Sequence, residues 1–144
     1  MIKTVAVGTD GSETAAKAVE FALDLASRYE AKIVFLSAYR PVSEDRLKRE
    51  ARDAPEDVQW QINPAEEVEP ALREAEEAAQ ERGLKSTSEA KEGEASKVLV
   101  ELASKHDADL LVIGNKGMSR KVLGSVPNTV SHKADCSVVI VKTT

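Results

Sequence analysis

The chain has 144 residues, of which 42% are hydrophobic and 31% charged, so it can bury one core and is too apolar to be disordered. Its formal net charge of −5 argues against a general binder of nucleic acid or anionic membrane, since phosphate contacts require a basic surface. Aromatic residues make up only 3%, so the core must consist of Val, Ile, Leu and Ala, as in a parallel sheet covered by Ala-rich helices.

The first third of the chain predicts a strand, a helix and a second strand. Residues 2–8 (IKTVAVG) are rich in β-branched residues and end in a polar turn, where Ser12 is a suitable N-cap. Over 13–30, apolar residues recur at helical spacing with charged residues on the other side. Residues 32–39 (KIVFLSAY) form a second apolar run, which Arg40-Pro41 stops.

The middle of the chain has weaker signals. Mixed charges over 42–63 predict an irregular excursion with at most a short charged helix. The helix that follows ends at Gly83, and Asn63-Pro64 resembles its cap and first turn, but Pro70 favours a later start. Residues 84–90 (LKSTSEA) make a poor strand by composition. We assign them to one because the alternation requires it and an edge strand tolerates polar residues.

The last third completes the alternation of strands and helices. Apolar residues from 95 to 103 predict a helix, and 110–113 form a short strand buried on both faces. A glycine-containing loop over 114–125 leads into a short helix over 126–134 and a last strand, Ser137–Val141. We therefore predict one α/β domain over residues 1–144, an open parallel sheet whose strands are joined by helical crossovers.

Cysteine usage and hydrophobic patterning indicate the compartment. Cys136 is the single cysteine, which excludes an intrachain disulfide, and no Cys/His spacing resembles a zinc site. The first apolar run is too short for the core of a signal peptide, and no apolar stretch is long enough to span a bilayer. We expect a cytoplasmic protein without a metal site or a membrane partner.

The candidate site follows from the sheet. In an open parallel sheet, ligands bind outside the carboxyl ends of the strands, where neighbouring crossovers run to opposite faces. The loops after the first and fourth strands are therefore the segments to inspect. In the first loop, the carboxylate of Asp10 can accept hydrogen bonds from ribose hydroxyls. The alternative is an Asx residue that shapes the turn.

The second loop carries two glycine-containing segments, GNKG at 114–117 and GSVPN at 124–128. Glycines let the backbone approach a phosphate, successive amides form an anion-binding nest, and the following helix adds the positive end of its dipole. The hydroxyl of Ser125 can donate one further hydrogen bond. The alternative is a glycine-bearing surface loop followed by a helix cap.

Charge placement favours an anion at the second loop. Residues 110–134 contain no acidic residue but include Lys116, Arg120, Lys121 and Lys133, whereas 43–83 carries 13 acidic and 6 basic residues. Such a basic segment in an acidic protein favours anion binding, with a solvated basic face as the alternative. The glycine spacings match neither the P-loop nor the dinucleotide-binding motif, so neither a P-loop ATPase nor a dehydrogenase is indicated.

Three segments together resemble the universal stress proteins over nearly the whole chain: VAVGTDGS, DLLVIGNKG and GSVPNTV. They are most similar to bacterial, particularly actinobacterial, members. The resemblance implies a Rossmann-like sheet, as in the adenine nucleotide alpha hydrolases, with strand order 3-2-1-4-5 and helices on both faces. It also implies a dimer, and in one branch ATP bound through G-x2-G-x9-G-[ST]. Some similar proteins bind cyclic AMP.

The resemblance also assigns site residues. Gly114 and Gly117 match the first two glycines of the motif, and Gly124-Ser125 match its last pair. Asp10 falls at the ribose-binding acid. The remaining matched positions line the adenine or contact a phosphate through the backbone. Those for adenine are Gly8, Thr9, Ala38 and Ile113, the phosphate-contacting one is Val126, and Asn115 completes the loop that follows the fourth strand.

The chain departs from the family motif at one place. Six residues, 118–123, separate Gly117 from Gly124, where the motif has nine. The loop therefore offers fewer backbone amides to a triphosphate. We expect ATP, AMP or cyclic AMP as the ligand, with Mg²⁺ accompanying ATP, and a weaker preference for the triphosphate than the full motif implies.

The sequence is compatible with three functions. The favoured one is an adenine-nucleotide-binding stress-response or signalling module, and the alternative is a family member that acts through protein contacts. A dedicated enzyme is disfavoured because His106 and His132 lie outside both loops, and Cys136, at the start of the last strand, is interpreted as a buried, inert cysteine. The apolar strand Ser137–Val141 would be an exposed edge in a monomer, so we expect a homodimer through it.

Overall fold

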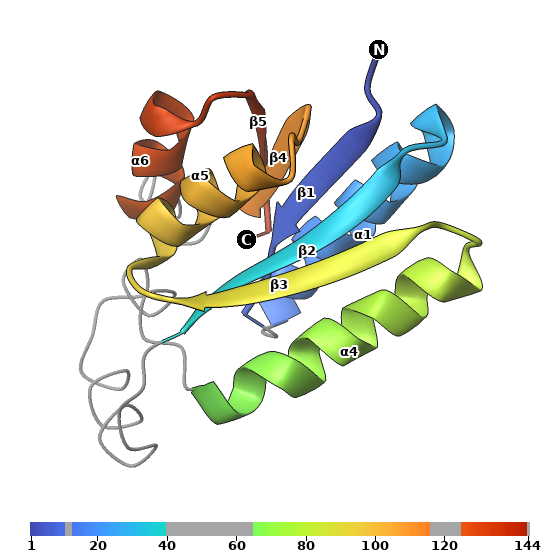
Figure 1. Cartoon of the computed structure of the whole chain (residues 1–144), viewed down its shortest axis with the longest axis horizontal. Helices are drawn as coiled ribbons and strands as arrows, with labels where there is room; N and C mark the ends of the chain where they lie inside the picture. The colour runs from blue at the N-terminus through green and yellow to red at the C-terminus, as the bar shows by residue number, and fades with distance from the viewer. Residues whose placement is uncertain (11–12, 40–64, 116–124, 144) are drawn as a thin grey trace.

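The computed structural model describes residues 1–10, 13–39, 65–115 and 125–143, which form a parallel sheet between two layers of helices (Figure 1). The sheet has the order β3-β2-β1-β4-β5. The strands are β1 (Thr4–Gly8), β2 (Lys32–Tyr39), β3 (Ser86–Glu92), β4 (Leu110–Gly114) and β5 (Ser137–Val141). The helices are α1 (Glu13–Tyr29), α4 (Ala65–Glu81), α5 (Ala95–Lys105) and α6 (Ser125–Lys133). The predicted fold and strand order are confirmed. The predicted cap at Ser12 and the excursion over 42–63 lie outside the described residues.

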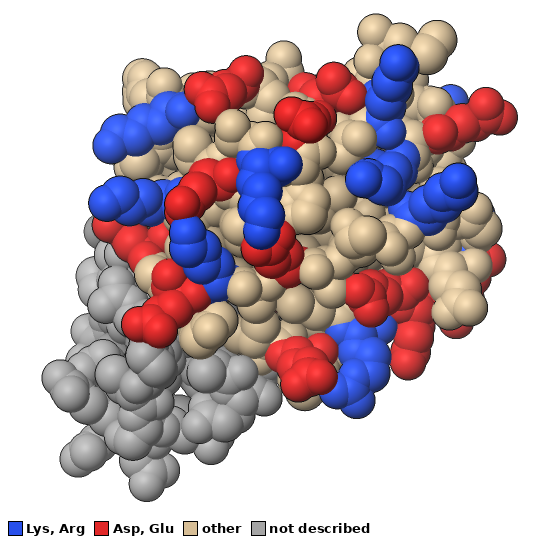
Figure 2. Space-filling model, viewed as in Figure 1, with Lys and Arg blue, Asp and Glu red and all other residues tan. Residues whose placement is uncertain are grey.

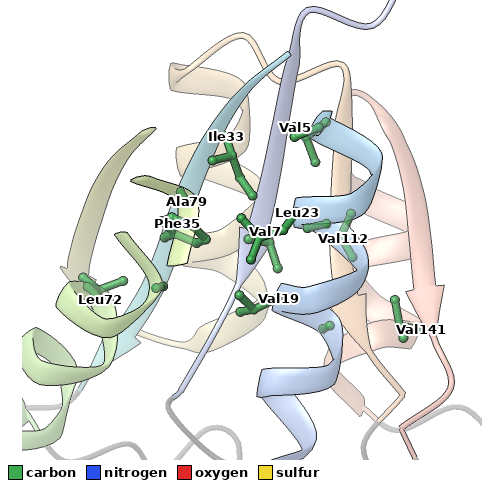
Figure 3. Close-up of a cluster of buried hydrophobic side chains, with 14 of the residues drawn as sticks. Val5, Val7, Val19, Leu23, Ile33, Phe35, Leu72, Ala79, Val112 and Val141 are labelled. Carbon is green, nitrogen blue, oxygen red and sulfur yellow. The ribbon is translucent and has the colours of Figure 1, made fainter. Parts of the chain in front are cut away.

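Helices α1 and α4 cover one face of the sheet. Alternate residues of the strands supply the core beneath them, including Val7 of β1, Phe35 of β2 and Val112 of β4 (Figure 3). The inner side of α1 is mostly alanine, with Leu23 fully buried among them. Small side chains let this helix lie close to the strands, which is why so few aromatic residues are needed.

Helices α5 and α6 cover the other face with the intervening residues of the same strands. Ala6 of β1, Leu36 of β2 and Ile113 of β4 pack there against Leu99 of α5 and Val130 of α6. Strands β1, β2 and β4 are thus buried on both faces, so their sequences are continuous apolar runs. Composition alone therefore predicts these three strands.

Strand β3 is the polar edge strand, and it lies two residues later than the predicted 84–90. Its side chains are held by partners on both helical layers. Ser88 donates a hydrogen bond to Glu76 of α4, and Lys91 Nζ lies 2.7 Å from Glu101 Oε1 of α5. Acidic and basic side chains are interspersed over the face shown in Figure 2. Pairing with β2, rather than apolar burial, therefore specifies this strand.

Helix α4 begins at Ala65 and contains Pro70, so the later start favoured by the proline is wrong. Pro70 is the sixth helical residue, and its ring removes only one backbone hydrogen bond near the helix start. The predicted end at Gly83 is confirmed. Gly83 has φ +70°, and Leu84 N–H donates to Ala79 O at 3.0 Å, the pattern of a helix closed by a left-handed residue.

Candidate functional site

The carboxyl ends of β1 and β4 lie side by side at the centre of the sheet. Val7 pairs with Val112 in register, so Gly8 and Ile113 fall at the next level. The chain leaves β1 into α1 on one face and reaches α6 on the other face after β4. This is the point where crossovers diverge and where parallel sheets bind ligands. The described residues of the predicted site at these two strand ends are Gly8, Thr9, Asp10, Ile113, Gly114 and Asn115.

Backbone hydrogen bonds extend the sheet beyond these strand ends. Thr9 N–H donates to Leu36 O at 2.9 Å, and Asn115 N–H donates to Val141 O at 2.9 Å. Both residues are buried, with Thr9 exposed by 3% and Asn115 by 2%. The first residues past the strands are therefore held as firmly as the strands themselves.

The space beside each of the two described glycines of the site is occupied by another side chain of the protein. A Cβ on Gly8 would lie 3.1 Å from both terminal carbons of Leu99 of α5. A Cβ on Gly114 would lie 3.3 Å from Cγ2 of Thr143. Carbon atoms normally approach to about 3.5–4.0 Å. Both glycines are thus explained by internal packing, whereas the sequence suggested close approach to a ligand.

Three residues predicted to contact the nucleotide have their side chains in the core between the sheet and helices α5 and α6. Ala38, Ile113 and Val126 are at most 3% exposed and pack in the cluster beneath α5 and α6. Val126 lies in the first turn of α6, close to the free amide groups that begin every helix. Because their side chains are buried, these residues would contact a ligand mainly through their backbone groups.

Asp10 follows β1 and is half-buried at the strand end, with a polar or charged interaction to the protein. This position leaves both interpretations open, the ribose acceptor and the turn residue. Gly117 and Gly124 lie outside the described residues, as do Lys116, Arg120 and Lys121 and the side chain of Ser125. The predicted phosphate loop is therefore described only at its two ends, Asn115 and α6.

Sequence reasoning missed Thr143, a buried residue of the C-terminal tail. Its backbone N–H and its Oγ1 both donate to Asn115 Oδ1, at 2.7 and 2.8 Å. Its carbonyl oxygen accepts a hydrogen bond from Lys17 Nζ of α1 at 3.0 Å. Asn115 and Thr143 are 28 positions apart, and no motif links them, so the sequence contained no signal for this contact.

A pocket of about 160 Å³ lies between α1 and α4 and was also not predicted. Its walls are mainly alanine, with Val19 and Leu23 of α1, and Glu20 and Glu74 are its acidic residues. Only Thr9 belongs both to this pocket and to the predicted site. The pocket therefore lies on the α1 and α4 side of the sheet, whereas Ile113 and Val126 pack on the opposite side.

The histidines and the cysteine, which most often carry chemistry, lie outside the predicted site residues. His106 caps the C-terminus of α5, and His132 lies in the last turn of α6. Hydrogen bonds from Lys105 and from His106 hold the pKa of the Glu89 carboxyl below its usual value. Burial raises the pKa of the Cys136 thiol, so the thiolate is disfavoured. Among the described residues, no cluster of His, Cys, Asp and Glu is arranged to hold a metal ion.

A parallel sheet of order β3-β2-β1-β4-β5 with helices on both faces defines an open, doubly wound α/β protein. Within this class, the model of the universal stress protein family matches residues 1–142, and the chain belongs to that family. The predicted family is thus confirmed. None of the helices in the described ranges has the length and apolar character needed to cross a membrane.

Individual relatives cover the chain almost completely. Universal stress protein Rv1636 of Mycobacterium tuberculosis is 40% identical over 146 residues, which span 99% of this chain and 97% of that protein. Universal stress protein YxiE of Bacillus subtilis is 30% identical over 149 residues, spanning 99% of this chain and 100% of that protein.

Solved structures agree with the fold. A universal stress protein crystallised in complex with cAMP is 34% identical, covers 99% of both chains and superposes with a TM-score of 0.76. A universal stress protein from Archaeoglobus fulgidus in complex with dAMP is 18% identical, covers 97% of both chains and has a TM-score of 0.67. The second likeness supports the fold alone.

Proposed function

We propose that this protein binds an adenine nucleotide, as ATP, AMP or cyclic AMP, and acts as a stress-response or signalling module in the cytoplasm. One observation carries the proposal. A relative that is 34% identical over 99% of the chain, with a TM-score of 0.76, was crystallised with cAMP. The crevice at the ends of β1 and β4 is the place where such a ligand binds in an open parallel sheet.

The proposed contacts use groups of three kinds. Asp10 accepts hydrogen bonds from the ribose hydroxyls, and the strand ends at Gly8, Thr9, Ala38 and Ile113 line the adenine. The amides of the loop from Gly114 to Gly117, together with Gly124, Ser125 and Val126 at the start of α6, hold phosphate. A Mg²⁺ ion would neutralise charge on the outer phosphates when ATP is bound.

We infer a binding role without dedicated catalysis. The helices run antiparallel to the strands, so the C-terminal ends of α5 and α6 lie at the amino edge of the sheet. His106 lies at the end of α5, 2.7 Å from Glu89 of the edge strand β3, and His132 lies in the last turn of α6, so neither is among the residues proposed to contact the nucleotide. A general acid or base must lie within hydrogen-bond reach of its substrate.

Titration calorimetry with ATP, ADP, AMP and cyclic AMP tests the proposal directly. Asp10→Ala should weaken every ribose-containing ligand by about 1.5–3 kcal/mol, because the lost hydrogen bonds involve a charged group. Glu13→Ala is the matched control, since it removes the same charge from an exposed position in the first turn of α1. Equal affinity of the Asp10 variant, or an equal loss with a ligand that lacks both hydroxyls, would make Asp10 a turn residue.

The second candidate function is a dimeric protein-interaction module without a nucleotide. The observation that favours it is strand β5, which lies at the sheet edge with Val138, Val139 and Ile140 only partly covered. Apolar edge strands promote pairing with another chain. We propose a homodimer through Ser137–Val141. Val139→Lys should convert it to a monomer in light scattering, and a wild-type monomer at working concentration would contradict the proposal.

A further inference from the structure

The side chain of Asn115 is fixed in one orientation by the C-terminal tail. A backbone N–H can only donate a hydrogen bond, so the atom that accepts from Thr143 N at 2.7 Å must be Oδ1 and not Nδ2. The Thr143 hydroxyl donates to the same oxygen at 2.8 Å. Both bonds are buried, and together they exclude the flipped amide.

This orientation leaves the amino group of Asn115 as a donor directed away from Thr143. The structure shows no hydrogen bond from Nδ2 to any described residue. Asn115 as a whole is 2% exposed, so its amino group lies at a nearly closed position at the end of β4. A buried amide donor requires an acceptor, and a ligand at the strand end can supply one.

Thr143 is itself held from two sides. Lys17 Nζ of α1 donates to its carbonyl oxygen at 3.0 Å. Its methyl group fills the space that a side chain at Gly114 would take, since a Cβ there would lie 3.3 Å from Thr143 Cγ2. Thr143 is therefore held against both α1 and the end of β4 by contacts that do not involve Asn115.

We propose that Thr143 is a positioning residue that holds Asn115 so that its amino group donates to a phosphate oxygen of the bound nucleotide. The inference rests on the proposed function, because Asn115 directly follows β4 at the proposed site. It adds a role for a tail residue 28 positions away from Asn115. Lys17 contributes by holding the carbonyl oxygen of this tail residue.

Two substitutions distinguish the role of the Asn115 amino group from that of Thr143. Asn115→Asp keeps two oxygens that accept from Thr143, but it replaces the amino group by a second, negatively charged oxygen. Affinity for AMP should fall at least about tenfold, because a charge-assisted donor is lost. Affinity for adenosine, which has no phosphate, should stay unchanged. Thermal unfolding should show some loss of stability from the new buried charge, and unchanged adenosine binding separates this cost from the loss of the donor.

Thr143→Val is the neutral test, since it removes only the hydroxyl donor and adds no charge. One of the two bonds that orient Asn115 is lost, so AMP should bind about two- to tenfold more weakly, the range for a single hydrogen bond. Adenosine binding should again be unchanged. Thr143→Ser keeps the hydroxyl and should restore the affinity for AMP.

Calorimetry with AMP and adenosine on these four proteins distinguishes the possible failures. If the wild-type chain binds neither ligand, the proposed function and this inference both fail. If it binds AMP and Asn115→Asp binds AMP equally well, only the inference fails. Equal losses for AMP and adenosine in Thr143→Val, with no recovery in Thr143→Ser, would mean that Thr143 supports the fold and does not orient a phosphate donor.

Discussion

Replacing Gly8 with alanine should destabilise the protein by about 1–3 kcal/mol, the usual cost of adding a methyl group to a packed core. The new Cβ would lie 3.1 Å from Cδ1 and from Cδ2 of Leu99, and 3.6 Å from Cγ2 of Ile113. Leu99 of α5 is fully buried, so it cannot turn into solvent to relieve the contact. Unlike Gly83 and Gly93, Gly8 has no positive φ, so the alanine backbone is unstrained and the cost is steric.

A double-mutant cycle isolates this contact. Leu99→Ala alone should cost about 2–5 kcal/mol, the range for truncating a buried leucine. In that background the methyl group added at position 8 has space, so Gly8→Ala should be neutral or stabilise by up to about 1 kcal/mol through the unfolded chain. The coupling energy is then at least about 1 kcal/mol.

Urea unfolding of the four proteins at one pH measures the coupling energy. Gly83→Ala is the control, because its φ of +70° strains the backbone while nothing lies within 4 Å of the new Cβ. Its cost should be the same in the native chain and in the Leu99→Ala background. If Gly8→Ala costs equally much in both backgrounds, Leu99 is not the reason for glycine at this position.

Two further predictions concern pH and ligand choice. The Asp109 carboxylate accepts hydrogen bonds from the backbone N–H groups of Lys3 and Thr4, which hold its pKa below the usual value. Its stabilising contribution is therefore present at neutral pH and is lost as the pH falls below about 4 and through the folded-state pKa. Asp109→Asn should lower the midpoint of urea unfolding at pH 7 and flatten its dependence on acid pH; an unchanged acid dependence would contradict this. Because the loop between Gly117 and Gly124 is three residues shorter than the family motif, AMP or cyclic AMP should bind within about tenfold of ATP, a difference of at most about 1.4 kcal/mol. Calorimetry checks this, and inserting three residues after Ser119 should raise the affinity for ATP without improving AMP; ATP binding a hundredfold tighter than AMP in the native chain would refute it.

The fold was predictable where burial requires a recognisable pattern of apolar residues in the sequence. Strands β1, β2 and β4 are covered on both faces, so each is a continuous apolar run that few other structures explain. Strand β3 was assigned by alternation alone and placed two residues too early, because an edge strand with polar partners has no apolar pattern. The start of α4 was predicted too late. Pro70 suggested a later start, but the helix packs against the sheet and includes the proline.

The location of the candidate site was predictable for a different reason. The ends of parallel strands meet at one edge whatever the side chains are, so placing β1 and β4 side by side also places Gly8 beside Ile113. The interpretation of the glycines was not predictable. Whether the space beside a glycine belongs to a ligand or to the protein depends on residues distant in sequence, here Leu99 and Thr143.

Whether a ligand or a side chain occupies the space beside a glycine changes how the site can vary among related chains. A glycine that admits a ligand is constrained by the ligand, whereas a glycine filled by a side chain is constrained by that side chain. Gly114 and Thr143 are coupled in this second way, since the 3.3 Å separation from Cγ2 disappears when Thr143 becomes serine. Gly114→Ala should therefore be tolerated better in the Thr143→Ser background than in the native chain, while the serine hydroxyl still orients Asn115. The end of β4, where the candidate site is proposed, can in this way be adjusted from the tail without any change in the other residues of that site.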